Sequence, residues 1–412
     1  MEEFVTPCGV AYRRGWLGAP GDDASPLLLL AHGTGFHALV WQPTINALHC
    51  GDLANAPIEL IAFDWSGHGL SRPLSGSGAS AERCHWDELG SDDVLDVLEA
   101  AGGGRRRPVY GIGHSFGGGC LVLVELARPG TFSGLILFEP VIRPEPMVGK
   151  HVLAELALRR RSRFEVESHH ELVAHFEKAF SGWTIEAVEA YVQRGFRCLP
   201  DGKGFELCCE PEAEASVYLG GMTTSVVGPA WCRLGEIQCT AALAVGRASR
   251  TLGAGGQSGT QAFEKIAAAF PRLSLPLATA PCGHNIPMED PVWTAAFVAA
   301  ALGSSLRDLG GGSATVPHGL RDCGRDVEVP TAIIIRKGSV GDRVGLQLET
   351  ALAGRTFVKK IVEGGLASAA GLEVDDVIAC VNHTRVTDRV HGAELISSAE
   401  GAVKVDIVRR RP

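Results

Sequence analysis

The chain has 412 residues, of which 45% are hydrophobic and 21% are charged, and its formal net charge is -9. Because a single hydrophobic core seldom grows much beyond ~300 residues, this length predicts two domains. The negative charge argues against a nucleic-acid-binding protein, and we interpret the basic clusters at 105–107, 159–163 and 409–411 as solvated surface.

The N-terminus and the cysteines indicate the compartment. Met1-Glu-Glu-Phe4 is acidic and lacks the basic and apolar parts of a secretory signal, and no run approaches the ~18 apolar residues of a membrane span. The twelve cysteines are scattered without a repeated spacing, so we interpret them as buried free thiols. We therefore expect a cytoplasmic protein without a transmembrane segment.

Apolar runs alternate with helical patterns in the first third of the chain. Alternation of apolar and polar residues predicts an edge strand over 5–12, and apolar runs predict further strands over 26–31, 59–63, 107–112 and 132–138. Helices are expected over 40–48, 86–100 and 116–128. Strands that alternate with helices imply a largely parallel sheet.

A sharp turn joins the strand at 107–112 to the helix at 116–128. It contains Gly113-His-Ser-Phe-Gly117, a Gly-x-Ser-x-Gly signature. Glycines allow the backbone to close tightly around a serine held in strained geometry. We interpret the turn as a nucleophile elbow with Ser115 at its tip.

The pattern changes between about 144 and 235. Helical patterns at 152–163, 170–180 and 185–195 follow one another without a strand between them, which predicts a helical cap over the carboxyl end of the sheet. The series then resumes with strands over 239–245 and 273–279 and helices over 260–270 and 291–302.

An acyl-transfer serine needs a base, a carboxylate that orients the base, and amides that hold the oxyanion. His284 follows the last predicted strand and is the candidate base. The turn His32-Gly-Thr-Gly35 can supply one oxyanion amide from Thr34, and Phe116 can supply the other as the residue after the nucleophile. No cofactor and no metal ion are expected.

Four motifs together resemble the α/β-hydrolase superfamily of lidded esterases and lipases: His32-Gly-Thr-Gly-Phe36, Asp64-Trp-Ser-Gly-His-Gly69, the serine elbow, and Gly283-His284 with Pro287. The resemblance implies an α/β fold with a mostly parallel sheet and a helical cap, and it assigns residues 1–302 to this domain. In this family Asp64 is usually structural, and we interpret His68 and His114 as packing or hydrogen-bonding residues.

The acid departs from the commonest family pattern. Members usually carry an aspartate after the seventh strand, whereas Val245-Gly-Arg-Ala-Ser249 places a serine there. Glu139, at the end of the sixth strand, is similar to the sixth-strand acid of some dehalogenases and becomes the candidate. The alternative is that Glu139 is a carboxylate that simply ends a strand at the cap hinge.

A serine nucleophile favours hydrolysis of an ester, thioester or amide through an acyl-enzyme over halide or epoxide chemistry. We therefore expect a small-molecule ester or related acyl substrate. Several aromatic residues either line an apolar acyl pocket or belong to the core, and both interpretations stay open. They are Trp41, Phe180, Trp183, Tyr191 and Trp231.

A change in composition marks the second domain. Residues 303–329 include Gly310-Gly-Gly-Ser313 and show no periodicity, which is typical of a linker. Residues 330–412 are rich in strand patterns, at 331–336, 343–348, 357–362, 377–381 and 403–409, with one helix near 390–398.

This C-terminal segment resembles a PDZ domain. The motifs are Arg343-Val-Gly-Leu346, Gly364-Gly-Leu-Ala367 and Asp376-Val-Ile-Ala-Cys-Val-Asn382. The resemblance implies a protein partner whose peptide C-terminus is held by backbone amides. It assigns the amides to Val344, Gly345 and Leu346, the apolar pocket to Leu348, Leu395 and Ile396, and the first position of the groove helix to Arg389, with the ligand class left open.

These residues leave three functions open. The first is a serine hydrolase carried to its partners by the PDZ-like domain. The second is a catalytically inactive hydrolase-fold scaffold or binding protein, for which the missing seventh-strand acid is the support. The third is hydrolysis of a carbon-carbon bond or a peptide by the same three residues, which the sequence does not separate from ester hydrolysis.

Overall fold

The computed structural model describes residues 1–74, 84–102, 107–142, 152–223, 229–249, 259–308, 328–339, 342–350, 356–374, 376–382, 384–386, 389–399 and 401–410. The chain divides into two compact units. The first comprises Met1–Pro43, Ala56–Asp290 and Ser304–Asp308, and the second comprises Thr44–Asn55, Pro291–Gly303 and Leu309–Pro412. The predicted Gly-rich stretch at 310–313 lies outside the described residues, as do Arg105, Arg106 and Arg411 of the basic clusters.

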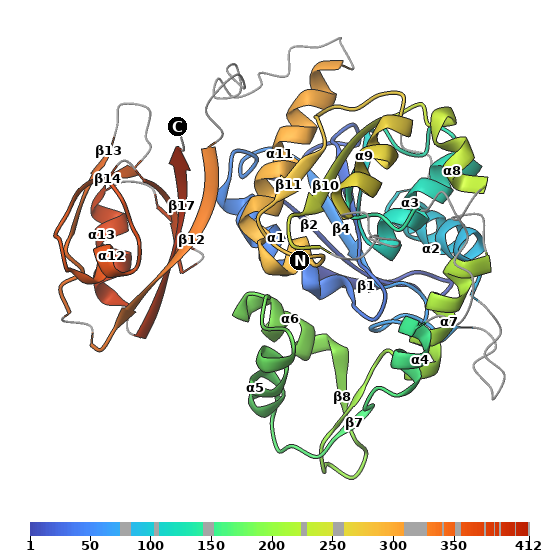
Figure 1. Ribbon diagram of the computed structural model, residues 1–412, viewed down its shortest axis with the longest axis horizontal. Coiled ribbons are helices and arrows are strands. Elements are labelled where there is room, and N and C mark those ends of the chain that lie inside the picture. The colour runs from blue at the N-terminus through green and yellow to red at the C-terminus, as the bar shows by residue number, and fades with distance from the viewer. Residues whose placement is uncertain are drawn as a thin grey trace. The chain divides into compact units, whose positions relative to one another are not determined.

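An eight-stranded sheet forms the centre of the first unit, in the order β1-β2-β4-β3-β5-β6-β10-β11 (Figure 1). The pairs β1–β2 and β2–β4 are antiparallel, and every other neighbouring pair is parallel. The predicted mostly parallel sheet is therefore confirmed. The strands are Glu2–Val5, Ala11–Trp16, Leu27–Ala31, Glu59–Phe63, Val109–His114, Gly134–Phe138, Thr240–Gly246 and Ala278–Ala280, for β1 to β6, β10 and β11.

The single edge strand predicted over 5–12 is wrong, because two strands, β1 and β2, are joined there by a tight turn. Within the turn the Thr6 amide donates to the Val10 carbonyl (2.8 Å), and the Val10 amide donates to the Thr6 hydroxyl (3.0 Å). Gly9 takes a φ of 89°, which favours glycine. The turn reverses the chain where alternation alone predicted a continuous strand.

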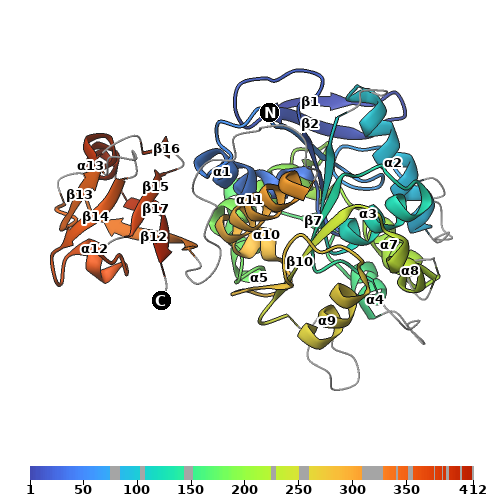
Figure 2. The ribbon, with the colours of Figure 1, turned by 90° about the horizontal axis from the view of Figure 1, so that it is seen from above.

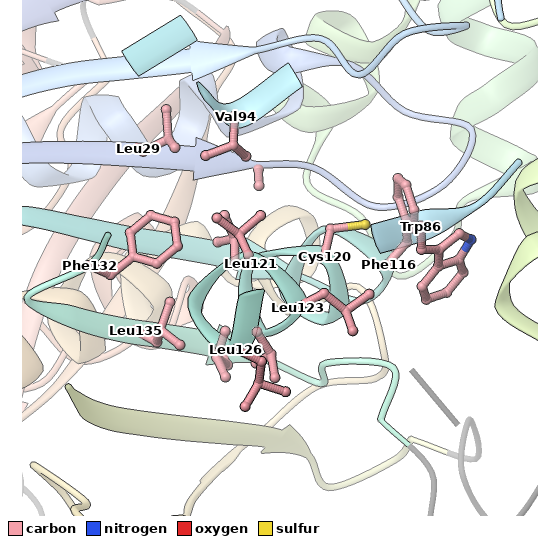
Figure 3. Close-up of a cluster of buried hydrophobic side chains, with 14 of the residues drawn as sticks. Leu29, Trp86, Val94, Phe116, Cys120, Leu121, Leu123, Leu126, Phe132 and Leu135 are labelled. Atoms are coloured by element: carbon pink, nitrogen blue, oxygen red, sulfur yellow. The ribbon is translucent and has the colours of Figure 1, made fainter. Parts of the chain in front are cut away.

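Helices α2 (Trp86–Ala100) and α3 (Phe116–Ala127) lie side by side against the sheet (Figures 1 and 2). Their apolar faces bury a large core together with the strands. Figure 3 shows Leu121 of α3 gathered with Leu29, Val94 and Leu135. The other short elements of this unit outside the insertion are η1 (Ala38–Trp41), α9 (Gly259–Ala269) and α10 (Ile286–Glu289).

The insertion between β6 and β10 is not purely helical as predicted. It contains three short strands, β7 (Arg163–Phe164), β8 (Phe196–Cys198) and β9 (Phe205–Leu207), paired in the order β7-β9-β8. Strands of two or three residues are too short to show an alternating pattern. The helices are α4 (Val152–Leu158), α5 (His169–Ala179), α6 (Ile185–Gly195), α7 (Pro211–Thr223) and α8 (Pro229–Arg233), followed by η2 (Leu234–Glu236).

The second unit contains α1 (Gln42–Cys50), most of α11 (Pro291–Asp308) and a β-rich C-terminal part. Its main sheet has the order β12-β17-β15-β14-β13, with every pair antiparallel, and β16 pairs with β15. The strands are Glu328–Lys337, Leu346–Thr350, Thr356–Ile361, Val377–Val381, Thr384–Arg385 and Gly401–Arg410, for β12 to β17; the helices are α12 (Leu366–Ala369) and α13 (Arg389–Ser398).

The cysteines are only partly the buried free thiols that we predicted. Nine described cysteines are free, but Cys8, Cys198 and Cys232 among them are exposed. Cys50, at the end of α1, is disulfide-bonded. Within the described residues, no helix is both long enough and apolar enough to cross a membrane.

Candidate active site

Ser115 lies at a sharp turn between β5 and α3, with φ 53° and ψ -119°. A Cβ at Gly113 would lie 2.5 Å from the Cα of Gly118, and one at Gly117 would lie 2.5 Å from the carbonyl oxygen of His32. These distances leave room only for glycine. The glycines of the signature therefore have the role that the sequence predicted, since they let α3 begin directly after the serine.

The three predicted catalytic side chains meet at the carboxyl ends of the strands. The Nε2 atom of His284 lies 3.1 Å from the Ser115 hydroxyl oxygen, and its Nδ1 atom lies 2.5 Å from Oε2 of Glu139. The Glu139 side chain is fully buried, whereas 24% of the His284 side chain is exposed. An imidazole protonated at Nδ1 would donate to the carboxylate and accept from the serine.

Glu139 follows β6 in a left-handed conformation, with φ 45°. Its Oε1 accepts a hydrogen bond from the Gly246 amide (2.7 Å), and its Oε2 accepts from the Ser249 hydroxyl (2.7 Å) in addition to His284. A non-glycine residue in this region costs on the order of 1–3 kcal/mol and persists only where its surroundings fix it. The carboxylate is thus held in one orientation by donors from the end of β10.

Two residues hold the backbone of the His284 loop. Glu289 accepts hydrogen bonds from the amides on either side of the histidine, Gly283 (2.5 Å) and Asn285 (3.0 Å). His114 donates from Nε2 to the His284 carbonyl (3.0 Å). Burial lowers the pKa of His114 well below its usual value, so its ring is neutral. Glu289 is not among the predicted site residues, although its place in a short helix directly after His284 was a visible signal.

The Gly-rich turn after β3, His32 to Phe36, lies beside the elbow. His68 accepts a hydrogen bond from the Gly35 amide at Nε2 (3.1 Å), and burial lowers its pKa to about 4. Among the described residues, none accepts a hydrogen bond from the amide of Thr34 or of Phe116. These two predicted oxyanion donors thus have no acceptor in the described part of the chain.

Asp64 forms hydrogen bonds with two backbone segments next to this turn. It accepts hydrogen bonds from the amides of Ala38 (2.6 Å) and Leu70 (2.8 Å), and burial raises its pKa to about 6. Its carboxylate does not contact His284 in any described hydrogen bond or ion pair. The structural role that we predicted for Asp64 agrees with these contacts.

The alpha/beta hydrolase family model matches residues 28–297, which is more than half of the chain. The chain belongs to the alpha/beta hydrolase family. Among curated relatives, protein phosphatase methylesterase 1 of Mus musculus is 35% identical over 103 residues, which cover 25% of this chain and 24% of the relative. Monoglyceride lipase of Homo sapiens is 28% identical over 131 residues, which cover 31% of this chain and 39% of the lipase.

The chain therefore spans only about a quarter to two fifths of the length of these relatives. Among solved structures, the peroxisomal alpha-beta-hydrolase Lpx1 of Saccharomyces cerevisiae superposes with a TM-score of 0.59 and covers 75% of this chain and 85% of its own. At 17% sequence identity this similarity shows the fold alone.

Of the five aromatic residues considered for a pocket, two lie near the site and remain half-buried. Phe180 and Trp183 of the insertion stack at 4.3 Å between ring centroids, and Trp183 meets the ring of Phe36 edge-on at 5.2 Å. Phe36 in turn lies 6.3 Å from His114. Trp41 and Tyr191 are fully buried, and Trp231 packs against the hydrophobic core around the main sheet.

The insertion also contacts the Gly-rich turn through a polar group. Arg160 pairs with Glu214 of α7 and donates to the hydroxyl of Tyr191 of α6. A Cβ at Gly35 would lie only 2.7 Å from Oε1 of Glu214. The missing side chain of Gly35 thus allows the insertion to approach the Gly-rich turn.

Proposed function

We propose that this chain is a serine hydrolase that cleaves a carboxylic ester or a related acyl substrate through an acyl-enzyme. In this proposal Ser115 is the nucleophile, His284 is the base and Glu139 orients the base. The observation that supports it is the continuous array of hydrogen-bonding distances, 3.1 Å from serine to histidine and 2.5 Å from histidine to glutamate. The array needs no cofactor.

The proposed reaction follows from these positions. As the Ser115 oxygen attacks the carbonyl carbon, His284 takes the serine proton at Nε2, and Glu139 stabilises the imidazolium. The amides of Thr34 and Phe116 would donate to the oxyanion. His284 then returns the proton to the leaving group, which departs and leaves an acyl-enzyme. Water hydrolyses the acyl-enzyme by the same steps and restores the serine.

A small ester with an apolar group fits this site best. Phe36 lies 6.3 Å from His114, the residue before Ser115, and it continues through Trp183 to Phe180 as a row of half-buried rings that would offer an apolar surface to a substrate. The relatives are named as a methylesterase and a monoglyceride lipase, and both names describe the cleavage of esters.

A fluorophosphonate probe tests the nucleophile, because it reacts with a serine activated by a base. We expect the wild-type protein to be labelled and the Ser115→Ala variant to remain unlabelled. Ser181→Ala, which changes an exposed serine of the insertion, is the matched control and should be labelled like the wild type. Labelling of Ser115→Ala would exclude Ser115. An unlabelled wild type without activity on an ester panel would favour the inactive scaffold.

We further propose domain boundaries at 1–302, 303–329 and 330–412, with a cap over about 144–235 and a PDZ-like domain at the end. In the C-terminal sheet, β13 begins at Leu346 and is an end strand of the path, and α13 begins at Arg389. Gly345 takes a φ of 76°. These features support the capture of a partner's peptide C-terminus.

In this module the amides of Val344, Gly345 and Leu346 would hold the peptide carboxylate. Leu348 and Ile396 are buried in the core of the C-terminal part, and Leu395 packs against them. Binding of a peptide library with free C-termini tests the module, with C-terminally amidated peptides as the control. Equal binding of the free and the amidated peptides would contradict carboxylate recognition by this module, because the amide lacks the carboxylate charge.

A further inference from the structure

One carboxylate oxygen of Glu139, Oε2, accepts hydrogen bonds from two side chains. The donors are the Ser249 hydroxyl, at 2.7 Å, and the Nδ1 atom of His284, at 2.5 Å. We propose that Ser249 is a positioning residue for Glu139, whose hydroxyl fixes the carboxylate that orients His284. This inference rests on the proposed function, because it assigns a role within the same catalytic array.

The role follows from the burial of Glu139. A buried carboxylate must find hydrogen-bond donors, since water cannot solvate it. The Gly246 amide holds Oε1 and the Ser249 hydroxyl holds Oε2, so the two protein donors other than His284 come from the last residue of β10 and from the loop after it. Without the hydroxyl, only His284 would remain on Oε2 among these contacts. The carboxylate would then be free to turn about its last bond.

The hydroxyl is tested by comparing Ser249→Ala with Ser249→Thr on a short-chain ester. We expect Ser249→Ala to lower kcat by roughly tenfold, with little change in KM, because a hydrogen bond to a charged group is lost. In a plot of kcat against pH, the acidic limb should move to higher pH, since the less stabilised carboxylate of Glu139 holds the imidazolium proton of His284 more tightly. Ser249→Thr keeps the hydroxyl and should restore both kcat and the position of the acidic limb. A purely structural role would lower the melting temperature and leave the limb in place.

A rate and an acidic limb like those of the wild type in a folded Ser249→Ala variant would overturn the inference.

This outcome is separable from a failure of the proposed function. If the wild type is not labelled by a fluorophosphonate, or if Glu139→Gln keeps full activity, the catalytic array itself is wrong. If the wild type is active and Glu139→Gln is impaired, but Ser249→Ala behaves like the wild type, only the role of Ser249 is wrong.

Discussion

Glu139 combines full burial, a positive φ and three hydrogen bonds, from Gly246, Ser249 and His284. A side chain that simply ended a strand would not need this convergence. The contacts agree better with the orienting acid than with the alternative interpretation as a strand-ending carboxylate at the cap hinge. Its charge is therefore the property to test.

We predict that Glu139→Gln raises the activation barrier for ester hydrolysis by about 3 to 6 kcal/mol, because the amide is isosteric but cannot stabilise the imidazolium. Measurement of kcat/KM on a reactive ester checks this. Glu125→Gln is the matched control, since Glu125 is also buried and accepts hydrogen bonds from two backbone amides, Gly130 and Phe132. The control should affect stability and leave the rate unchanged. An unimpaired Glu139→Gln would move the acid elsewhere.

The candidate catalytic residues that the sequence could predict are those that belong to local motifs. Ser115 and His284 stand in short signatures, and Glu139 was found because a neighbouring strand lacked its usual acid. The bonds from Ser249 and Gly246 to Glu139 join segments more than one hundred residues apart. Such contacts depend on the strand order, which local patterns do not contain.

The loop from Gly283 to Glu289 acts as one element. Glu289, in the short helix α10, bonds the amides that flank His284, and the Thr184 amide of the insertion donates to the Met288 carbonyl (3.0 Å). The loop is therefore held from within and from the insertion. The position of His284 depends on these backbone contacts as well as on Glu139.

We predict that Glu289→Gln lowers kcat by roughly tenfold and stability by about 1–3 kcal/mol, because the neutral amide has one oxygen in place of two charged acceptors. Turnover of a short ester and urea denaturation measure the two effects. Glu212→Gln, on an exposed position of α7, serves as the control and should change neither. A variant with normal turnover would show that the loop does not need this carboxylate.

Among the elements, long periodic segments were predicted well and short ones poorly. The helix expected over 86–100 is α2 with the same bounds, and the helix over 185–195 is α6. The helix expected over 152–163 ends at Leu158, and Arg160, two residues further on, pairs with Glu214 and donates to the Tyr191 hydroxyl. Helix α11 runs to Asp308, beyond the predicted end at 302.

Across the whole molecule, buried titratable groups couple stability to pH. Burial lowers the pKa of His37 and His68 to about 4, and it also lowers the pKa of His32 and of His114 well below the usual value of a histidine. The unfolded chain takes up protons at these groups below pH 6.5, whereas the folded chain does not, so acid favours unfolding. Burial raises the pKa of Asp64 and Asp93 to about 6, which has the opposite effect between pH 4 and 6.

Since the effect of the four histidines on stability should exceed the opposite effect of the two aspartates, we predict that the free energy of unfolding falls as the pH drops from 6.5 towards 4. His37 alone can contribute up to about 3 kcal/mol, from its shift to about 4. Urea denaturation at pH 7 and pH 5 checks the trend. His37→Gln should flatten the dependence, whereas His170→Gln, on an exposed position of α5, should not. A stability that rises on acidification would contradict the prediction.

Hydrogen bonds to the backbone hold the His284 loop independently of the imidazole side chain. Its carbonyl is held by His114 and the neighbouring amides by Glu289, and none of these contacts uses the imidazole. In a His284→Ala variant the loop would keep its path, with Glu139 on one side of an empty, ring-sized space and Ser115 on the other. Since the native ring is partly open to solvent, free imidazole could enter that space. If His284 is the base, we therefore expect added imidazole to restore part of the activity that His284→Ala loses.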